Sequence, residues 1–436
     1  MHMNIDVNSL PYCVASDTDG NIFEIPPFRM TGRSLMEHRL PQRDELVSLP
    51  FGSNLYMLPD RHPVAFDPGR KEFVVIENYE GIPIHAVAAF MAPAYMQTLM
   101  SAWVREGHPS PLPLYSYTAV GWKDDRFLAA GHRIDDDIRQ DPECFDHDLI
   151  NKGTALFRKR FGKNRLALHL IDNCVCKYGC PAARNWVLNR WEAPLPTSPY
   201  CNSRCLGCIS CQPEESGVVS SQSRITFVPD PEDIARIAIQ HLETAERPVV
   251  SFGQGCEGEP LLAGDVLVEA VRLIRRSTGN GVINLNTNGS KPDVVERLCK
   301  AGLDSIRVSL NSAREEYYNR YYKPNGYSFR DVLDTFDIVK RNGKWTSINY
   351  FIFPGFTDQE DEMKPLFAMI EKYNLDMIQT RNLNIDPDWY IDTMELNTLF
   401  SGTSGMLEWK RKIKRYFPNL VLGYFNPSLH KMSRLI

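Results

Sequence analysis

Four cysteines lie within eleven residues near the middle of the chain. Cys201, Cys205 and Cys208 have the spacing C-x3-C-x2-C, and Cys211 follows three residues later. Three thiolates on one short loop suit an iron–sulfur cluster. The same loop suits a structural zinc ion if Cys211 is the fourth ligand. A group of free thiols is the third interpretation, and the loop alone does not decide between them.

A second group of cysteines precedes this loop. Cys174, Cys176 and Cys180 form C-x-C-x3-C, and Cys211 or Cys144 is available as a fourth ligand. These three thiols are a candidate site for an auxiliary iron–sulfur cluster. Against this interpretation, the sequence PAARNWVLNRW that follows is typical of a helix that packs on a core.

A loop suited to a zwitterionic ligand follows the cysteines. The sequence GCEGEP at 255–260 contains Gly258 and Glu259. Glycine lets the backbone approach a ligand closely, and a carboxylate can hold an ammonium group. A zinc-binding loop needs neither feature, so this sequence favours a metal cluster that binds a further molecule.

The elements that position these residues alternate between strands and helices from Pro194 onward. Segments such as 231–245 and 264–278 have apolar residues three and four apart, which is typical of helices. The pattern predicts an α/β fold in which parallel strands form a partial (β/α)6 TIM-like barrel. Ligands of such sheets bind at the carboxyl ends of the strands, where each of these polar clusters lies. The predicted strands are 196–200, 248–255, 281–289, 305–312, 346–355 and 376–384.

The first third of the chain has short β-type segments and one helix near 142–160. The segments 20–25, 53–58, 72–79, 82–90 and 114–122 are separated by turn residues. We therefore expect four parts: a β-rich N-terminal domain of unknown role (1–165), a cysteine-containing connector (166–194), the partial barrel (195–390) and a C-terminal extension of helix and strand (391–436).

The order of these motifs resembles the radical S-adenosylmethionine (radical SAM) superfamily over about 195–390. The resemblance rests on the cysteine triplet after the first strand, Gly-Glu-Pro after the second, and Asn-Gly and Ser-Leu-Asn after the next two. Within the superfamily, the chain is most similar to the molybdenum-cofactor cyclase and peptide-maturase branch. No cysteine follows Cys299, so the resemblance does not extend to the SPASM extension of many peptide maturases.

The resemblance implies a [4Fe–4S] cluster and S-adenosylmethionine, whose reductive cleavage gives a 5′-deoxyadenosyl radical that abstracts hydrogen from a substrate. It implies the following residues: Cys201, Cys205 and Cys208 as cluster ligands, Gly258 and Glu259 at the methionine amino group, Ser309 and Asn311 near its carboxylate or the ribose, and Thr287 and Asn288 within reach of cofactor or substrate.

Two positions depart from the family pattern. The aromatic residue usual before the third cysteine is replaced by Gly207, so the adenine contact must come from the backbone or from elsewhere, near 379–382. The usual double glycine before the glutamate is Glu257-Gly258, which adds a carboxylate to the loop.

The composition limits the partners and the cellular compartment that we expect. The formal net charge of −5 argues against nucleic acid as the default partner. With no secretory signal and no apolar run long enough to span a bilayer, we expect a cytoplasmic protein. The resemblance implies an oxygen-sensitive cluster that is reduced by flavodoxin or ferredoxin. The substrate, a peptide or protein or a small metabolite, stays open. The alternative function is a zinc- or iron–sulfur-bearing scaffold or electron-transfer protein without radical chemistry.

Overall fold

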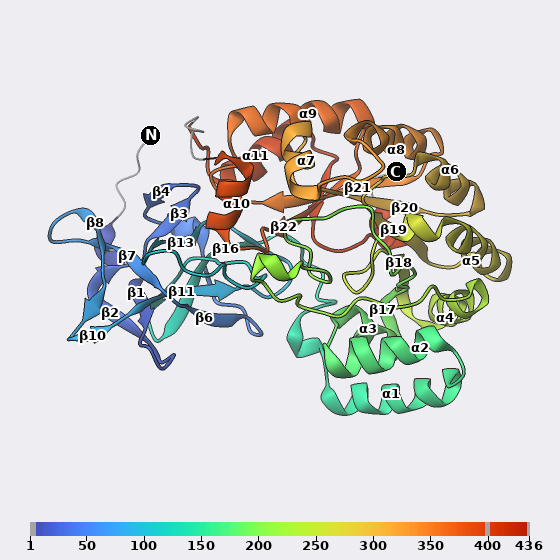
Figure 1. Cartoon of the computed structure of the whole chain (residues 1–436), viewed down its shortest axis with the longest axis horizontal. Helices are drawn as coiled ribbons and strands as arrows, with labels where there is room; N and C mark the ends of the chain where they lie inside the picture. Colours follow the sequence, from blue (N-terminus) through green and yellow to red (C-terminus); the bar gives the residue numbers. More distant parts are fainter. Residues whose placement is uncertain (1–5, 397–401, 434–436) are drawn as a thin grey trace.

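A strand-rich antiparallel domain and a curved parallel sheet surrounded by helices make up the computed structural model, which describes residues 6–396 and 402–433 (Figure 1). The two parts lie side by side, with the helices of the connector below the sheet. The predicted α/β partial barrel and the β-rich N-terminal domain are both present. No helix in the described residues is long and apolar enough to cross a membrane.

Eleven strands form the main sheet of the N-terminal domain, counted over the described ranges. The pairing order is β12-β16-β15-β1-β2-β7-β14, and β5, β6, β8 and β11 pair with members of this path. Strands such as β11, with the sequence HAVAAF, bury four consecutive residues and so form the core of the domain. The strands of the domain are β1 (Tyr12–Ser16), β2 (Ile22–Arg29), β3 (Gly32–Ser34), β4 (Glu37–Arg39), β5 (Leu46–Ser48), β6 (Asn54–Leu58), β7 (Arg61–Asp67), β8 (Glu72–Val75), β9 (Asn78–Tyr79), β10 (Ile82–Pro83), β11 (His85–Phe90), β12 (Tyr95–Gln97), β13 (Met100–Ser101), β14 (Trp103–Arg105), β15 (Val120–Lys123) and β16 (Arg126–Arg133).

The connector is helical. Its α1 begins after the N-cap Asp146, whose side chain accepts a hydrogen bond from the amide of Leu149. The fully buried Trp186 packs edge-on against Phe157, with ring centroids 4.8 Å apart, and so joins the last of these helices to the first. The connector helices are α1 (His147–Phe161), α2 (Arg165–His169), the π-helix η4 (Leu170–Lys177) and α3 (Pro181–Val187).

Seven parallel strands pair in chain order to form the curved sheet within the described residues. Because helices cover the outer face, these strands are almost continuously buried, and all six residues of β19 are buried. The strands are β17 (Arg190–Pro194), β18 (Glu246–Phe252), β19 (Val282–Thr287), β20 (Ser305–Leu310), β21 (Trp345–Ile352), β22 (Met377–Asn382) and β23 (Val421–Gly423).

The helices that cover this sheet follow its strands along the chain. Pro231 and Pro292 stand in the first turns of α4 and α6, where a residue without an amide hydrogen is tolerated. These helices are α4 (Pro231–Thr244), α5 (Gly264–Ser277), α6 (Pro292–Ala301), α7 (Glu315–Tyr322), α8 (Phe329–Arg341), α9 (Glu360–Tyr373), α10 (Pro387–Met394), α11 (Met406–Tyr416) and α12 (Leu429–Ser433).

The prediction of the first barrel strand at 196–200 is wrong. The first strand is β17, which lies just before the predicted segment in the chain and pairs with β18. The backbone leaves the strand after one more contact, in which the amide of Leu195 donates to the carbonyl of Ser251 at 2.8 Å. Pro196 and Pro199 have no amide hydrogen to continue the pairing. At the other edge, the C-terminal extension contributes β23, so the sheet gains a seventh strand beyond the six that were predicted.

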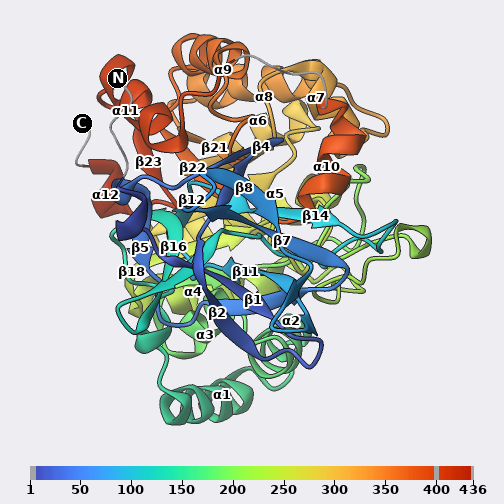
Figure 2. The same cartoon turned by 90° about the vertical axis from the view of Figure 1, so that its left-hand side faces the viewer.

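The N-terminal domain is docked on the carboxyl ends of β21 and β22. The amide of Leu35 donates to the carbonyl of Pro354 at 2.8 Å, and the amide of Gln97 donates to Asn382 Oδ1 at 2.8 Å. Figure 2 shows the strands of this domain in front of the barrel. The domain therefore covers the end of the sheet at which ligands of parallel sheets bind.

Candidate active site

The cysteine loop is held over the barrel by the end of α7. The amides of Arg204 and Leu206 donate to the carbonyls of Tyr322 and Tyr321, each at 2.9 Å. These main-chain contacts fix the loop without using its cysteine side chains, which stay free to bind a metal.

One cavity collects most of the predicted site residues. This cysteine cavity has a volume of about 190 Å³. Its lining includes eight of the nine residues predicted from the sequence: Cys201, Cys205, Cys208, Gly258, Glu259, Thr287, Asn288 and Ser309.

The ninth predicted residue, Asn311, lies elsewhere. It is buried, and its amide donates to the carbonyl of Tyr317 at 3.0 Å and to the hydroxyl of Tyr390 at 3.3 Å. These contacts tie the end of β20 to α7 and α10. Asn311 lines neither the cysteine cavity nor the larger cavity beside it.

Gly258 lies against the backbone of the cysteine loop. A Cβ at this position would lie 1.9 Å from the carbonyl oxygen of Tyr200, so only glycine fits. The amide of Gly258 donates to the carbonyl of Ser198, and the amide of Glu259 donates to the carbonyl of Tyr200, both at 2.7 Å. The loop after β18 is therefore packed directly on the residue before the first cysteine.

The carboxylate of Glu259 joins two strand ends. It accepts hydrogen bonds from the amides of Leu261 at 3.0 Å and Asn288 at 2.8 Å, and from the hydroxyl of Thr287. Burial raises the pKa of Glu259 to about 7, against the effect of these hydrogen bonds. An ammonium group in the cavity would favour its charged form.

Glu257 binds backbone amides of two loops. Its carboxylate accepts hydrogen bonds from four backbone amides, those of Thr197, Ser198, Gly253 and Gln254, at 2.7 to 3.0 Å. Burial raises the pKa of the Glu257 carboxyl group to about 7. The extra carboxylate noted in the sequence therefore holds together the loops that follow β17 and β18.

Asn288 connects the end of β19 to the cysteine loop. Its side-chain amide donates to Asn202 Oδ1 at 2.8 Å and to the hydroxyl of Ser203 at 3.0 Å. Asn202 in turn donates to the hydroxyl of Ser290 at 3.0 Å. These contacts position the loop between its first two cysteines.

The three cysteines fit a cluster better than a single ion. Burial, followed by the charge of Glu259, raises the pKa of Cys201 to about 11, and burial raises that of Cys205 well above the usual value. Such thiols lose their protons when a metal binds. Ligands of one ion lie close together, whereas the three sulfurs do not all lie within 4.8 Å of one another.

Arg224 Nη2 lies 3.6 Å from Cys208 Sγ, so a cation faces this sulfur and favours its thiolate form, which suits a cluster and a zinc ion alike. Another feature favours the cluster over a zinc ion. Cys211, the fourth ligand of the zinc interpretation, is exposed and lines neither cavity.

A second cavity of about 450 Å³, the interdomain cavity, adjoins the first. The two share Cys205, Cys208 and Ser309 in their linings. The N-terminal domain closes the interdomain cavity with Phe90, Met91, Ala92, Tyr95 and Ser116. Sequence reasoning assigned no role to these residues, because the two domains meet only in the folded chain.

Two arginines line the interdomain cavity, Arg307 on β20 and Arg381 on β22. Burial, followed by the charge of Arg381, lowers the pKa of Arg307 to about 9. Within the described residues their hydrogen-bond partners are neutral. Arg307 donates to Gln379 Oε1 at 2.6 Å, and Arg381 donates to the carbonyl of Thr380 at 3.5 Å. Sequence analysis named the segment 379–382, which contains Arg381, and missed Arg307, which stands two residues before the predicted Ser309.

An aromatic side chain from another element lies beside Gly207. A Cβ on Gly207 would lie 2.9 Å from the hydroxyl of Tyr321, which packs edge-on against Phe351. Tyr321 and Tyr322 line the interdomain cavity, together with Arg381 and Asn382 from the predicted segment 379–382. Aromatic and polar groups from α7 and β22 therefore surround the position next to the third cysteine.

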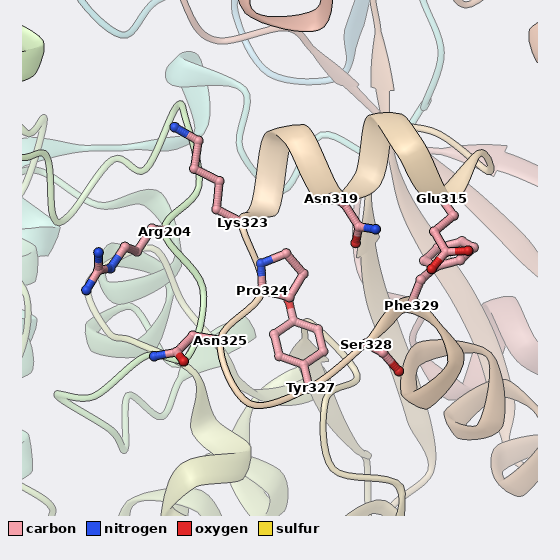
Figure 3. Close-up of a pocket in the computed structure, with 9 residues that line it drawn as sticks. All are labelled: Arg204, Glu315, Asn319, Lys323, Pro324, Asn325, Tyr327, Ser328 and Phe329. Atoms are coloured by element: carbon pink, nitrogen blue, oxygen red, sulfur yellow. The ribbon is translucent and has the colours of Figure 1, made fainter.

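A third hollow lies outside the site, on the outer side of α7. This outer groove of about 670 Å³ is lined by residues that include Arg204, Glu315, Asn319 and Lys323 (Figure 3). It contains no cysteine. Arg204 belongs to the cysteine loop, so the groove is a surface behind that loop.

The predicted auxiliary cysteines lie in different surroundings. Cys176 is exposed, whereas Cys174 is buried and its sulfur lies 3.8 Å from that of Cys256, in the loop after β18. The expected set of Cys174, Cys176 and Cys180 therefore does not share one environment.

Comparisons with known proteins concern the barrel. Residues 195–364 match the model of the Radical SAM superfamily. A protein of Thermococcus kodakarensis named "Probable GTP 3',8-cyclase" is 29% identical over 161 residues, 37% of this chain and 47% of that protein. The GTP 3',8-cyclase of Paenarthrobacter nicotinovorans is 26% identical over 202 residues, 45% of this chain and 52% of that protein. The chain thus spans about half the length of these relatives.

Among solved structures, that of methylornithine synthase is similar with a TM-score of 0.38 and 13% identity. The similarity covers 64% of this chain and 75% of that one.

Proposed function

Because residues 195–364 form a radical SAM domain, we propose that this chain is an enzyme that cleaves S-adenosylmethionine reductively and abstracts hydrogen from a substrate in the interdomain cavity. The observation that carries the proposal is the convergence of eight predicted residues on one cavity that adjoins a second. A scaffold or an electron-transfer protein needs no such second cavity.

The residues of the cysteine cavity are those that would hold the cofactors. Radical SAM domains use a [4Fe–4S] cluster and S-adenosylmethionine, which supply the electron transfer and the radical that removes a hydrogen atom. Cys201, Cys205 and Cys208 would bind the cluster, and Glu259 would balance the ammonium group of the methionine moiety. The N-terminal domain excludes water from the reacting atoms by covering the carboxyl ends of the strands.

The substrate we propose is a small anionic metabolite. Two guanidinium groups in the cavity wall lack an acidic hydrogen-bond partner within the described residues, and arginine binds carboxylates and phosphates well. A cavity of about 450 Å³ falls in the range of small-molecule sites. Since the N-terminal domain contributes one wall, that domain would select the substrate.

The reductant we propose is an acidic flavodoxin or ferredoxin that docks behind the cysteine loop. Arg204 lies in this loop and Lys323 ends the helix that holds it, and both are exposed beside the outer groove. A positive surface close to a cluster favours the approach of an acidic electron donor.

Metal analysis and cofactor cleavage test this function. Anaerobically reconstituted protein should contain about four irons for one cluster and form 5′-deoxyadenosine with dithionite. The Cys201→Ala/Cys205→Ala/Cys208→Ala variant should lose both. As a matched control, Cys211→Ala should keep both, because Cys211 is exposed outside the cavities.

Two results would contradict the proposal. A cluster without 5′-deoxyadenosine would indicate an electron-transfer protein. Zinc that depends on the same three cysteines, with no iron bound, would indicate a scaffold.

A further inference from the structure

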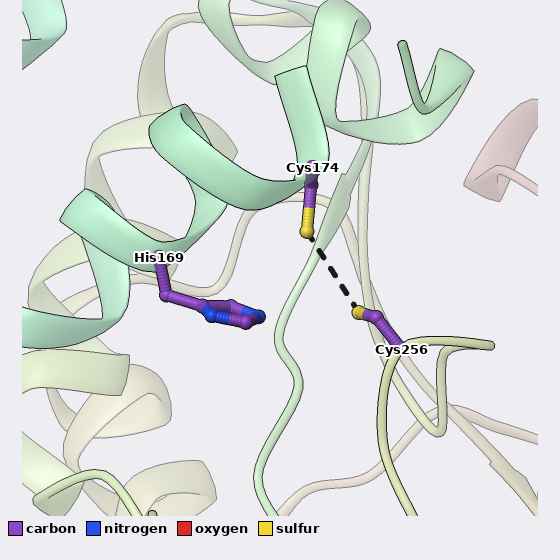
Figure 4. A group of neighbouring side chains, drawn as sticks. All are labelled: His169, Cys174 and Cys256. Atoms are coloured by element: carbon purple, nitrogen blue, oxygen red, sulfur yellow. Dashed lines mark hydrogen bonds between the residues drawn. The ribbon is translucent and has the colours of Figure 1, made fainter. Parts of the chain in front are cut away.

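We propose that His169, Cys174 and Cys256 bind one zinc ion that fastens the S-adenosylmethionine-binding loop to the connector. Figure 4 shows the three side chains converging from different segments. His169 ends α2, Cys174 lies on the π-helix η4, and Cys256 lies between β18 and Glu259. Such a site goes beyond the proposed function, because a radical SAM domain already has its own cluster cysteines.

The spacing of the donor atoms fits a single ion. One nitrogen and two sulfur atoms from the three residues all lie within 4.8 Å of one another, the only such group found in the described residues. The two sulfurs are 3.8 Å apart. Two thiolates bound to a tetrahedral zinc ion, each about 2.3 Å from it, also lie about 3.8 Å apart.

The imidazole of His169 supplies an independent observation. Its Nε2 is buried and makes no hydrogen bond of ordinary geometry, and the group that its ring faces is the thiol of Cys174. A buried nitrogen without such a hydrogen bond is costly, and a metal ion is the partner that an imidazole and two thiolates share. Cys174 and Cys256 are 3% and 5% exposed, so the two sulfurs are shielded from solvent, whereas His169 is partly exposed.

The other chemistries of two cysteines explain less of this arrangement. A disulfide needs the sulfurs to move from 3.8 Å to about 2.05 Å apart, and it would still leave His169 Nε2 without a hydrogen bond of ordinary geometry. An iron–sulfur cluster is held by thiolates on separate irons, whereas these donors are close enough to meet at one point. A nitrogen and two sulfurs are ligands that zinc accepts in tetrahedral sites.

Cys256 connects the proposed zinc site to the loop that would bind the cofactor. It is adjacent to Glu257, which binds the backbone after β17 and β18, and three residues before Glu259. Two ligands come from the connector and one from this loop, so a bound ion would cross-link segments 82 residues apart. Within the described residues no fourth histidine, cysteine or carboxylate lies within 4.8 Å of all three, so water is the fourth ligand that we propose.

Zinc content in a protein without cluster cysteines tests the proposal. The full-length Cys201→Ala/Cys205→Ala/Cys208→Ala variant, loaded with Zn²⁺ and dialysed, should retain about one zinc ion per chain. Adding Cys174→Ser or Cys256→Ser should abolish this zinc. Adding Cys299→Ser, a matched control in a buried cysteine of α6, should not.

Co²⁺ in place of Zn²⁺ gives a second readout that does not depend on those additional variants. The triple-alanine protein should bind one Co²⁺ and show absorption bands of thiolate-bound cobalt. Absence of zinc and of these bands from the folded triple variant would overturn the proposal. So would a Cys174–Cys256 disulfide found by mass spectrometry in anaerobically purified protein. Since this protein performs no radical chemistry, the result is independent of the proposed function.

Discussion

At the scale of single residues, the anionic substrate that we propose depends on the charges in the interdomain cavity. Burial, followed by the nearby charge of Arg381, disfavours the charged form of Arg307 and lowers its pKa. An anion between them would relieve both effects. The unliganded cavity is therefore an electrostatically unfavourable state that a negative ligand stabilises.

This arrangement predicts that anions stabilise the fold. Pyrophosphate should raise the Tm of the anaerobic protein, because a ligand that binds only the folded state stabilises it. The Arg307→Gln/Arg381→Gln variant should show a shift at least several-fold smaller at the same concentration. Differential scanning fluorimetry measures the shift.

The control is Arg126→Gln, which removes an exposed arginine of the N-terminal domain. It should respond to pyrophosphate as the unchanged protein does. An equal shift in all three proteins would mean that the anion acts through surface charge, and would contradict the assignment of these two arginines.

Site residues with a motif were predictable, and those without one were not. Cys201, Cys205 and Cys208 stand out by spacing within one loop. Arg307 belongs to no motif, and although Arg381 lies in the named segment 379–382, only the fold brings it to Arg307, 74 residues earlier. Glu257 shows the intermediate case: the sequence marks it as an added carboxylate, but its four amide partners lie on two loops that only the structure brings together.

At the scale of elements, helix α4 carries a buried histidine that makes stability depend on pH. His241 is fully buried, its Nε2 donates to the carbonyl of Trp191 at 2.8 Å, and burial lowers its pKa to about 4. The unfolded chain takes up a proton on this histidine below about pH 6.5, whereas the folded chain does so only near pH 4. Folded stability therefore falls as the pH decreases through this window.

The prediction is a pH-dependent difference between two proteins. The variant His241→Gln keeps an amide donor for Trp191. Relative to this variant, the unchanged protein should lose up to about 3 kcal/mol of unfolding free energy between pH 6.5 and pH 4. Denaturant unfolding at several pH values measures this difference. The carboxylates are the same in both proteins, so their contributions to the pH dependence cancel. A constant difference across the window would show that His241 is protonated in the folded state.

The elements of the barrel were predicted better than its edges. Strands β18 to β22 all lie within the predicted segments or within two residues of them, because buried parallel strands flanked by amphipathic helices have a strong pattern. The edge strands β17 and β23 are short, and β17 ends at Pro194. Their identity depends on pairing with a neighbour rather than on their own sequence.

At the scale of the whole molecule, buried ion pairs join the two domains. Arg61 donates to Asp386 Oδ2 at 3.0 Å, and Arg33 donates to Asp388 Oδ1 at 2.7 Å. Both arginines come from the N-terminal domain, and both aspartates lie at the start of α10, beyond the carboxyl end of β22. The wall of the interdomain cavity is therefore held in place by charges with little access to water.

Breaking one pair should loosen the wall without removing the cluster. Asp386→Ala leaves the buried Arg61 guanidinium without a carboxylate and with only the carbonyls of Pro59 and Ser110 as partners, which costs about 3–5 kcal/mol. We expect faster proteolysis between the domains, with iron content retained. The Arg61→Met/Asp386→Leu variant should recover protection, because it buries no charge. Unchanged proteolysis of Asp386→Ala would contradict a role of this pair in docking.

In the electron delivery that we propose, the cysteine loop, α7 and an external partner act together. Arg204 and Lys323 are exposed on the outer side of the loop whose other side lines the cysteine cavity. Arg204→Glu/Lys323→Glu should slow 5′-deoxyadenosine formation driven by flavodoxin by about 10-fold or more at low salt, since rim charges act mainly on association rates. With dithionite, which needs no docking surface, the rate should be unchanged.

The salt dependence separates this effect from a distorted loop. Exposed charges are screened at high ionic strength, so the difference between the two proteins with flavodoxin should shrink as salt is added. The control Arg330→Glu changes an exposed arginine on α8 and should leave the flavodoxin-driven rate within about twofold. A loss of rate with dithionite as well would show that Arg204 positions the cysteine loop instead, and would place the docking surface elsewhere.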